Sequence, residues 1–234
     1  MMTIKLFGML KDLAGGKDEV VWHAGHNGHS VKDLARELTD QFPQLGELIR
    51  EKKVLISVNH EIATDETSIH TEDEVALLPP FAGGTEVLAV IEEESVLVRV
   101  QRENFSVDQE IDRVRNSSKM IGGINVFLGT ARERSQGRDV SRITFDYYDG
   151  MAQKTLRGIR ERALKEFNIL EVLIIHRYGE IDIGENIVLI VVGAEHRADA
   201  FKACQWCIDE LKQITPIWKR ETTPAGEVWV EHHP

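Results

Sequence analysis

The cationic residues in the second half of the chain are those whose types and spacing suit chemistry. They are Arg132, His196, Arg197, Lys212, Lys219 and Arg220. Arginine binds an anion through paired hydrogen bonds, and a helix N-terminus, which His196 and Arg197 are predicted to occupy, attracts a phosphate. Lysine acts as a base or nucleophile where burial lowers its pKa. We therefore expect an anion site with lysine chemistry, against the alternative that each residue is an ordinary surface charge.

A second chemical feature is the stretch 79–84, which reads Pro-Pro-Phe-Ala-Gly-Gly. The prolines prevent a helix or a central strand from running through it. The two glycines carry no Cβ, so the backbone can enter a narrow slot that other residues would block. The stretch has two interpretations at this level: a slim tail that threads into a pocket, or a flexible linker between domains.

The cysteines and histidines give weaker signals. Cys204 and Cys207 are three residues apart in a predicted amphipathic helix, which favours buried small side chains over a redox pair. No second cysteine pair completes a zinc site. His23, His26 and His29 cluster without carboxylate or cysteine partners. We therefore predict no metal site, and no feature predicts a cofactor.

The elements of the first 80 residues follow a β-β-α-β-β order. Ser30 is a suitable N-cap for an amphipathic helix over 31–41 that ends before Pro43. The strands are predicted at 3–7, 17–22, 54–58 and 74–78. Four strands and one helix in this order are typical of an α+β domain in which a sheet wraps one helix.

From Thr85 the pattern restarts and predicts a second, larger α/β domain. A Ser106–Gln109 capping box opens a helix that runs to about Asn116, and an arginine-rich loop is predicted over 132–138. Two further helices are predicted, one carrying Leu156 and Ile159 on its apolar face and one over 196–213. Strands are predicted at 87–91, 96–100, 121–129, 143–148, 172–175, 187–192, 218–221 and 228–231.

Composition limits the classes of partner. The net charge of the 234 residues is −11, which divides into −6 up to Gly84 and −5 after it, so we expect neither nucleic acid nor an acidic membrane as a partner. The start of the chain has no uninterrupted apolar run of signal-peptide type, and two cysteines make no disulfide framework. These features predict a soluble cytoplasmic protein.

The motifs of both halves resemble the two subunits of molybdopterin synthase joined end to end. Residues 1–84 resemble the small subunit, with Lys5-Leu6-Phe7 near the start and the terminal Gly-Gly signature. Residues from about 95 resemble the large subunit through five ordered motifs. These are Gly-Thr-Ala-Arg at 129–132, Tyr-Asp-Gly-Met at 148–151, His-Arg-Tyr-Gly-Glu at 176–180, His-Arg-x-x-Ala-Phe at 196–201 and Pro-Ile-Trp-Lys-Arg-Glu at 216–221.

The resemblance implies a fold, a domain division and a reaction. The fold would be a ubiquitin-like β-grasp sulfur-carrier domain (1–84), a connector (85–94) and an α/β hammerhead-type catalytic domain (95–234). The carrier's terminal glycine, Gly84, would bear a thiocarboxylate whose sulfur is transferred in two steps to cyclic pyranopterin monophosphate, forming the molybdopterin dithiolene. An activating enzyme would adenylate and sulfurate the tail, and the large-subunit domain would form a homodimer.

The resemblance also implies roles for single residues. Lys212 and Lys219 match catalytic lysines, with acid/base and covalent roles for Lys212 both open. Arg132, His196 and Arg197 match anion-binding residues, and Arg220 belongs to the same substrate-binding group.

One feature departs from the family pattern, because Gly84 is joined by a peptide bond to Thr85 and therefore has no free carboxyl group. Three alternatives follow: the chain is cleaved after Gly84, the second half uses a separate carrier, or an uncleaved tail blocks its own pocket. A different class of function also stays open, a ubiquitin-like carrier module on a scaffold without chemistry of its own.

Overall fold

The computed structural model describes residues 2–22, 29–79 and 96–230 and divides the chain into two compact units, 1–81 and 82–234. Each unit has its own hydrophobic core. The predicted strand at 87–91, residues 80–84 of the Gly-Gly stretch, and His23 and His26 lie outside the described residues. No helix in the described ranges is both long and apolar enough to cross a membrane.

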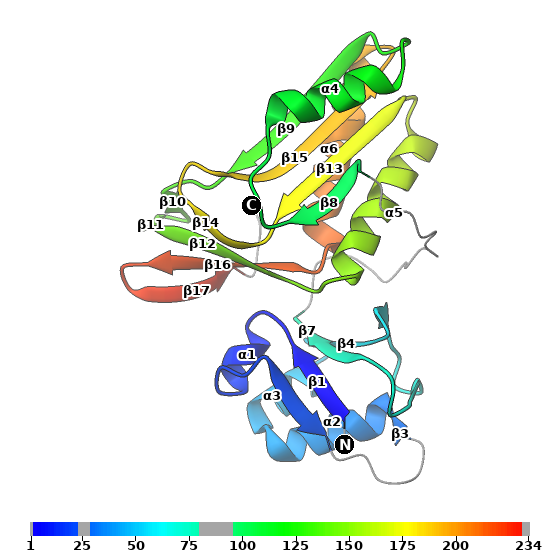
Figure 1. Cartoon of the computed structure of the whole chain (residues 1–234). Coiled ribbons are helices and arrows are strands. Elements are labelled where there is room, and N and C mark those ends of the chain that lie inside the picture. Colours follow the sequence, from blue (N-terminus) through cyan, green and yellow to red (C-terminus); the bar gives the residue numbers. More distant parts are fainter. Residues whose placement is uncertain (1, 23–28, 80–95, 231–234) are drawn as a thin grey trace. The chain divides into compact units, whose positions relative to one another are not determined.

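The first unit is a mixed five-stranded sheet with helices packed on it (Figure 1). The sheet order is β2-β1-β7-β4-β5, with β1 and β7 parallel and the other pairs antiparallel. A small second sheet pairs β3 with β6. The strands are β1 (Met2–Leu6), β2 (Glu19–Trp22), β3 (His29–Ser30), β4 (Leu55–Val58), β5 (Glu61–Ile62), β6 (Ser68–Ile69) and β7 (Val75–Leu78), and the helices are α1 (Leu10–Leu13), α2 (Val31–Gln41) and α3 (Pro43–Arg50).

Helix α2 forms where the apolar periodicity predicted it. Ser30 is its N-cap: the Ser30 hydroxyl accepts from the Asp33 N–H, and the Asp33 carboxylate accepts from the Ser30 N–H. This capping box satisfies two backbone donors that a helix start would otherwise leave unpaired. Leu34 and Leu38 are fully buried against the sheet. Pro43 ends α2, as predicted, and also begins α3, because proline suits the first position of a helix.

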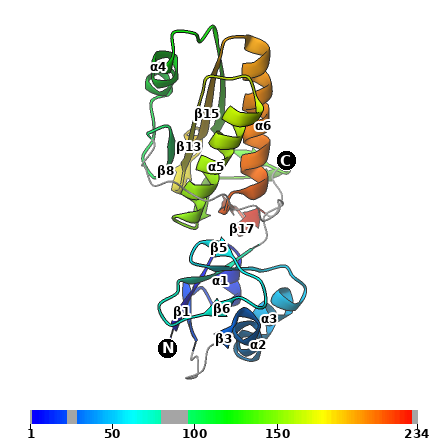
Figure 2. The same cartoon turned by 90° about the vertical axis from the view of Figure 1, so that its right-hand side faces the viewer.

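The second unit is built on a four-stranded sheet of order β8-β13-β15-β9. Helices α5 and α6 lie side by side on one face and α4 lies on the other (Figures 1 and 2). The buried strands alternate accordingly: Ile174 and Ile190 belong to the core under α5 and α6, while Ile175 and Leu189 belong to the smaller core under α4. The elements are β8 (Val98–Gln101), α4 (Val107–Ser117), β9 (Gly123–Thr130), α5 (Met151–Glu166), β13 (Glu171–Arg177), β15 (Asn186–Ala194) and α6 (Arg197–Ile214).

A second, antiparallel sheet of order β14-β12-β16-β17 completes this unit, beside a short hairpin. Its strands are β12 (Arg142–Tyr147), β14 (Gly179–Asp182), β16 (Ile217–Thr223) and β17 (Gly226–Val230), and the hairpin is β10 (Arg134–Ser135) with β11 (Arg138–Asp139).

Two local predictions for the second unit were wrong. The segment 132–138 is not simply a loop, because most of it belongs to the β10–β11 hairpin, whose turn residues Gln136 and Gly137 both have positive φ. Ser106 is the N-cap of α4, but its side chain makes no capping hydrogen bond, so the predicted capping box is absent. The fold class and the main elements agree with the sequence-based expectation.

Candidate active site

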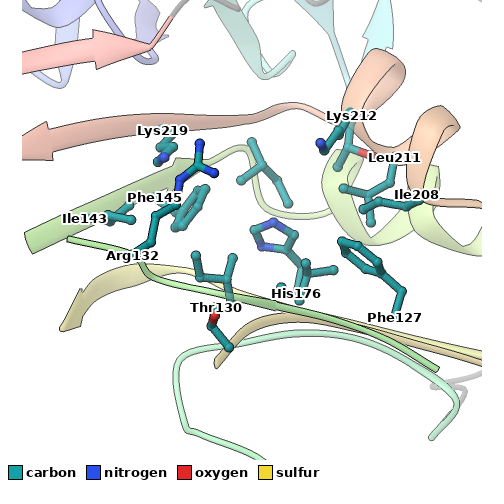
Figure 3. Close-up of a pocket in the computed structure, with 15 residues that line it drawn as sticks. Phe127, Thr130, Arg132, Ile143, Phe145, His176, Ile208, Leu211, Lys212 and Lys219 are labelled. Atoms are coloured by element: carbon teal, nitrogen blue, oxygen red, sulfur yellow. The ribbon is translucent and has the colours of Figure 1, made fainter. Parts of the chain in front are cut away.

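A pocket of about 440 Å³ lies in the second unit where β9, β12, β13, β16 and the end of α6 meet. Apolar side chains, among them Phe127, Phe145 and Ile208, form much of its wall. Three of the predicted cations, Arg132, Lys212 and Lys219, also line it. Figure 3 shows Arg132 and Lys219 on one side of the pocket, Lys212 on the other side, and the ring of His176 between them. A largely apolar hollow with a few converging polar groups is the usual form of a small-molecule site.

Lys212 reaches the pocket from the last turn of α6. The helix ends at Ile214 because Pro216 cannot continue it, and the Thr215 N–H closes the last turn on the carbonyl oxygen of Leu211. Ile208, Leu211 and Thr215 line the pocket beside Lys212. A lysine in the last turn also interacts favourably with the negative end of the helix dipole.

Lys219 reaches the pocket from β16, on the same face of the strand as Ile217 and Glu221. Its Nζ lies 2.6 Å from Oε1 of Glu221, whose side chain is completely buried. Burial alone would raise the pKa of Glu221, but hydrogen bonds from Lys219 and Ser135 and the charges of Lys219 and Arg138 outweigh it and hold the pKa below its usual value. Glu221 is therefore a buried carboxylate that stays ionised beside a pocket lysine.

Arg132 follows β9, and the residue before it is fixed by two backbone hydrogen bonds. The Ala131 N–H donates to the Glu185 carbonyl at 2.9 Å, and the Gly184 N–H donates to the Ala131 carbonyl at 2.7 Å. These bonds tie the end of β9 to the connection between β14 and β15. They hold the backbone from which the Arg132 side chain enters the pocket.

His176 is a pocket residue that sequence reasoning did not select. It is the last but one residue of β13, is only 5% exposed, and packs edge-on against Phe145 with ring centroids 5.1 Å apart. Its Nδ1 lies 2.7 Å from the carbonyl oxygen of Arg177. Since a carbonyl only accepts, Nδ1 carries the hydrogen, and Nε2 is the nitrogen whose protonation can change. The sequence feature that could have identified His176 as a site residue was its place in the His-Arg-Tyr-Gly-Glu motif.

Three other predicted residues do not line this pocket. His196 is the N-cap of α6 and Arg197 its first residue, so they lie at the end of the helix opposite Lys212. Lys212 is fifteen residue steps after Arg197 in α6, which is about 22 Å along a helix. Arg220 points away from the Lys219 face of β16: it pairs with Glu227 at 2.8 Å, and its guanidinium lies 5.2 Å from the Trp229 ring centre.

The two cysteines are core residues of α6. Cys204 and Cys207 are both buried and unbridged, as the sequence pattern favoured. Burial raises the pKa of Cys204 to about 11 and that of Cys207 to about 12. Neither thiol therefore has the thiolate character of a redox centre.

The two units and the pocket define a class of protein: a β-grasp carrier domain joined to an α/β domain with a cationic pocket. Residues 4–84 match the ThiS family, and residues 100–214 match the MoaE protein family. The chain is 46% identical over 129 residues to the molybdopterin synthase catalytic subunit of Pyrococcus abyssi, which covers 55% of this chain and 86% of that protein. It is 38% identical to the catalytic subunit of Arabidopsis thaliana, over 60% of this chain and 71% of the relative.

Solved structures agree with this class. The molybdopterin synthase of Staphylococcus aureus superposes with a TM-score of 0.55 at 30% identity and covers 58% of this chain and 98% of its own. A complex of subunits 1 and 2 of the molybdopterin-converting factor from Helicobacter pylori, at 17% identity, shares the fold with a TM-score of 0.50 over 59% of this chain and 92% of its own. The chain belongs to the molybdopterin synthase catalytic subunit family, and it carries a ThiS-type carrier domain in the same polypeptide.

Proposed function

We propose that this molybdopterin synthase acts as a sulfurtransferase and that its pocket is the place of sulfur transfer. The observation that carries the proposal is the convergence of Arg132, Lys212 and Lys219, from the segment after β9, from α6 and from β16, on one largely apolar pocket. A chain that only displayed a carrier domain would have no need for these three cations in one hollow. The proposed substrate is cyclic pyranopterin monophosphate.

The proposed reaction transfers sulfur from the glycine of the carrier domain to the pterin in the pocket of the catalytic domain. The thiocarboxylate sulfur of the carrier glycine forms a bond to a side-chain carbon of the pterin as that carbon's bond to oxygen breaks. At one carbon the oxygen leaves with the phosphate group, which opens the cyclic phosphate, and at the other it leaves as water. Water then cleaves the bond between the sulfur and the acyl carbon. The carrier leaves as an ordinary carboxylate, and the sulfur stays on the pterin. A second carrier delivers the second sulfur in the same way, which completes the dithiolene.

Each pocket residue has a role that fits its surroundings. Arg132 binds the substrate phosphate, because a guanidinium offers two parallel donors to an anion. Lys212 and Lys219 stabilise the negative charge that develops during transfer and move protons, and Lys212 either acts as acid and base or accepts the acyl group transiently. His176, with its tautomer fixed by Arg177, is suited to exchanging a proton through Nε2.

The helix geometry supports a homodimer in which a second copy completes the site. His196 and Arg197, about 22 Å from Lys212 along α6, do not reach the pocket of their own chain. The exposed apolar side chain of Phe201 is on the next turn of α6. The start of β9, at Gly123, lies close to the backbone of Arg197. Farther along the edge strand β9, Val126 and Leu128 are also exposed. We propose that this surface pairs with a second copy, which would bring its His196 and Arg197 to the substrate.

The carrier function requires a free glycine carboxyl group. We propose that the chain is cleaved between Gly84 and Thr85 and that a separate activating enzyme then adenylates and sulfurates Gly84, in the cytoplasm. The domains would be the carrier (1–84), the connector (85–94) and the catalytic domain (95–234). Intact-mass analysis of protein from its native host tests the cleavage: active material entirely at full length, without another carrier present, contradicts it.

The sulfurtransferase activity is tested by adding a separate thiocarboxylated carrier and the pterin substrate to the full chain. We expect dithiolene formation by the natural chain and a large loss in Lys212→Ala. Lys165→Ala is a matched control, since Lys165 is an exposed lysine in the last turn of α5. Unchanged activity in Lys212→Ala contradicts the catalytic assignment, and activity that rises when the chain is cut at Gly84 identifies a self-blocked form.

A further inference from the structure

Lys219 shares its carboxylate partner with a second cation outside the pocket. Glu221 is fully buried, and its Oε1 lies 2.6 Å from Lys219 Nζ, while its Oε2 lies 3.6 Å from a guanidinium nitrogen of Arg138. Lys219 and Arg138 are far apart in the sequence, but both pair with the carboxylate of Glu221. Arg138 itself does not line the pocket.

The β10–β11 hairpin is the element that brings Arg138 to Glu221. Its tight turn at Gln136 and Gly137 places Ser135 and Arg138 opposite each other in the register. Both residues help to hold the pKa of Glu221 below its usual value, Ser135 through its hydroxyl and Arg138 through its charge. The hairpin starts two residues after Arg132, so one short segment contributes both to the pocket wall and to the partner of Lys219.

The charges around Lys219 show what this arrangement does. The pocket presents Arg132 from the segment after β9, Lys212 from α6 and His176 from β13, and the strand itself contributes Glu221. Glu221 is the anion among these groups, and it favours the protonated form of Lys219. A second cation on the same carboxylate offsets part of that effect, because Arg138 attracts Glu221 and repels the ammonium of Lys219.

We propose that Arg138 is a positioning residue for sulfur transfer, which acts by sharing the buried Glu221 carboxylate with Lys219 and so sets how readily Lys219 gives up its proton. This inference rests on the proposed role of Lys219 in the pocket. The shared carboxylate also fixes the position of Lys219 Nζ, since Glu221 is completely enclosed and held from the hairpin side as well.

The inference predicts opposite pH effects for the two partners. Arg138→Gln removes the second cation from Glu221, so protonated Lys219 is stabilised and the pH at which it titrates moves up. Glu221→Gln removes the anion and leaves a nearby cation, so that pH moves down. We expect the larger displacement in Glu221→Gln, because Glu221 contacts Lys219 directly, and the smaller one in Arg138→Gln, because Arg138 acts through Glu221.

The experiment measures the pH–rate profile of dithiolene formation with a thiocarboxylated carrier for the full chain and its variants. Arg138→Gln is expected to move the Lys219 step of the kcat profile to higher pH with little change in KM, and Arg138→Lys, which keeps the charge, is expected to restore it. Arg134→Gln is the matched control, because Arg134 is in the same hairpin but pairs with the exposed Asp139 at 3.4 Å.

A second readout separates this inference from the proposed function. The pH dependence of acetylation at Lys219, followed by peptide mass spectrometry, measures the protonation of the Lys219 amine. This measurement does not require an active enzyme. Absence of dithiolene formation in the natural chain would overturn the proposed function alone. An acetylation midpoint that is the same in the natural chain, Arg138→Gln and Arg134→Gln would overturn the role of Arg138, and so would a shift to lower pH in Arg138→Gln. Arg138 is 39% exposed, so its replacement is compatible with folding.

Discussion

Nδ1 of His176 lies 2.7 Å from the carbonyl oxygen of Arg177, the next residue of β13. The contact fixes one tautomer of a histidine that is buried in the pocket wall, with its ring against Phe145. A fixed tautomer gives the ring one defined proton-exchanging nitrogen, which is what a general acid or base requires. The residue is therefore a strong target for mutation.

We expect His176→Gln to lower kcat for dithiolene formation by roughly 10²-fold, the usual lower range for losing a general acid or base. Glutamine can keep a hydrogen bond to the Arg177 carbonyl but cannot exchange a proton at neutral pH. The pH–rate profile should therefore lose one ionisation. His70→Gln, an exposed site in the first unit, is the control. A variant with a lower rate but an unaltered profile would assign His176 a purely structural role.

Arg132 is predicted to act on substrate binding. Removing a charge-assisted hydrogen bond costs about 1.5–3 kcal/mol, so Arg132→Ala should raise KM for the pterin by roughly 10- to 100-fold. Arg132→Lys should recover only part of this, because an ammonium lacks the paired donors of a guanidinium. The decisive comparison is a substrate analogue without its phosphate: equal KM effects with and without the phosphate would contradict the assignment.

Sequence patterns predicted the framework better than the site. Apolar periodicity located α2 and α6 because each buries one continuous face, and continuous runs rich in β-branched residues located the buried strands β13 and β15. The β10–β11 hairpin was missed because its residues are polar throughout and carry no alternating pattern. Spacing did not show that Arg132, Lys212 and Lys219 converge, since three separate elements bring them together. The sequence pattern did not single out His176 as a site residue, because His176 continues a buried strand.

The proposed completion of the site by a second copy can be tested by complementation. Arg197→Ala and Lys212→Ala should each inactivate the homodimer. In a mixed dimer, the Arg197→Ala copy keeps its own Lys212 and receives Arg197 from its partner, so one natural site is restored. Random mixing should recover about a quarter of natural activity, because half of the dimers are mixed and each has one site. If both residues act within one chain, mixing recovers nothing.

The buried cysteines should be chemically inert in the folded protein. Burial raises the pKa of Cys204 to about 11 and that of Cys207 to about 12, so little thiolate exists at pH 8. Alkylation with iodoacetamide at that pH should be slow until denaturant is added, and Cys204→Ala with Cys207→Ala should leave sulfur transfer intact if the double variant folds. Rapid modification of the native chain, with loss of activity, would instead support a redox role.

Glu221 should make the stability of the second unit depend on pH. Its folded-state pKa is below the ordinary value of 4.5, so the unfolded chain binds the proton more readily than the folded one does. The stabilisation by this carboxylate is therefore complete above about pH 4.5 and is lost as pH falls through the folded-state pKa. We expect the denaturation midpoint of Glu221→Gln to lie below that of the natural chain at pH 7 and the gap to narrow on acidification. Urea titrations of both proteins at several pH values measure this gap, and a gap that widens toward acid would contradict the lowered pKa.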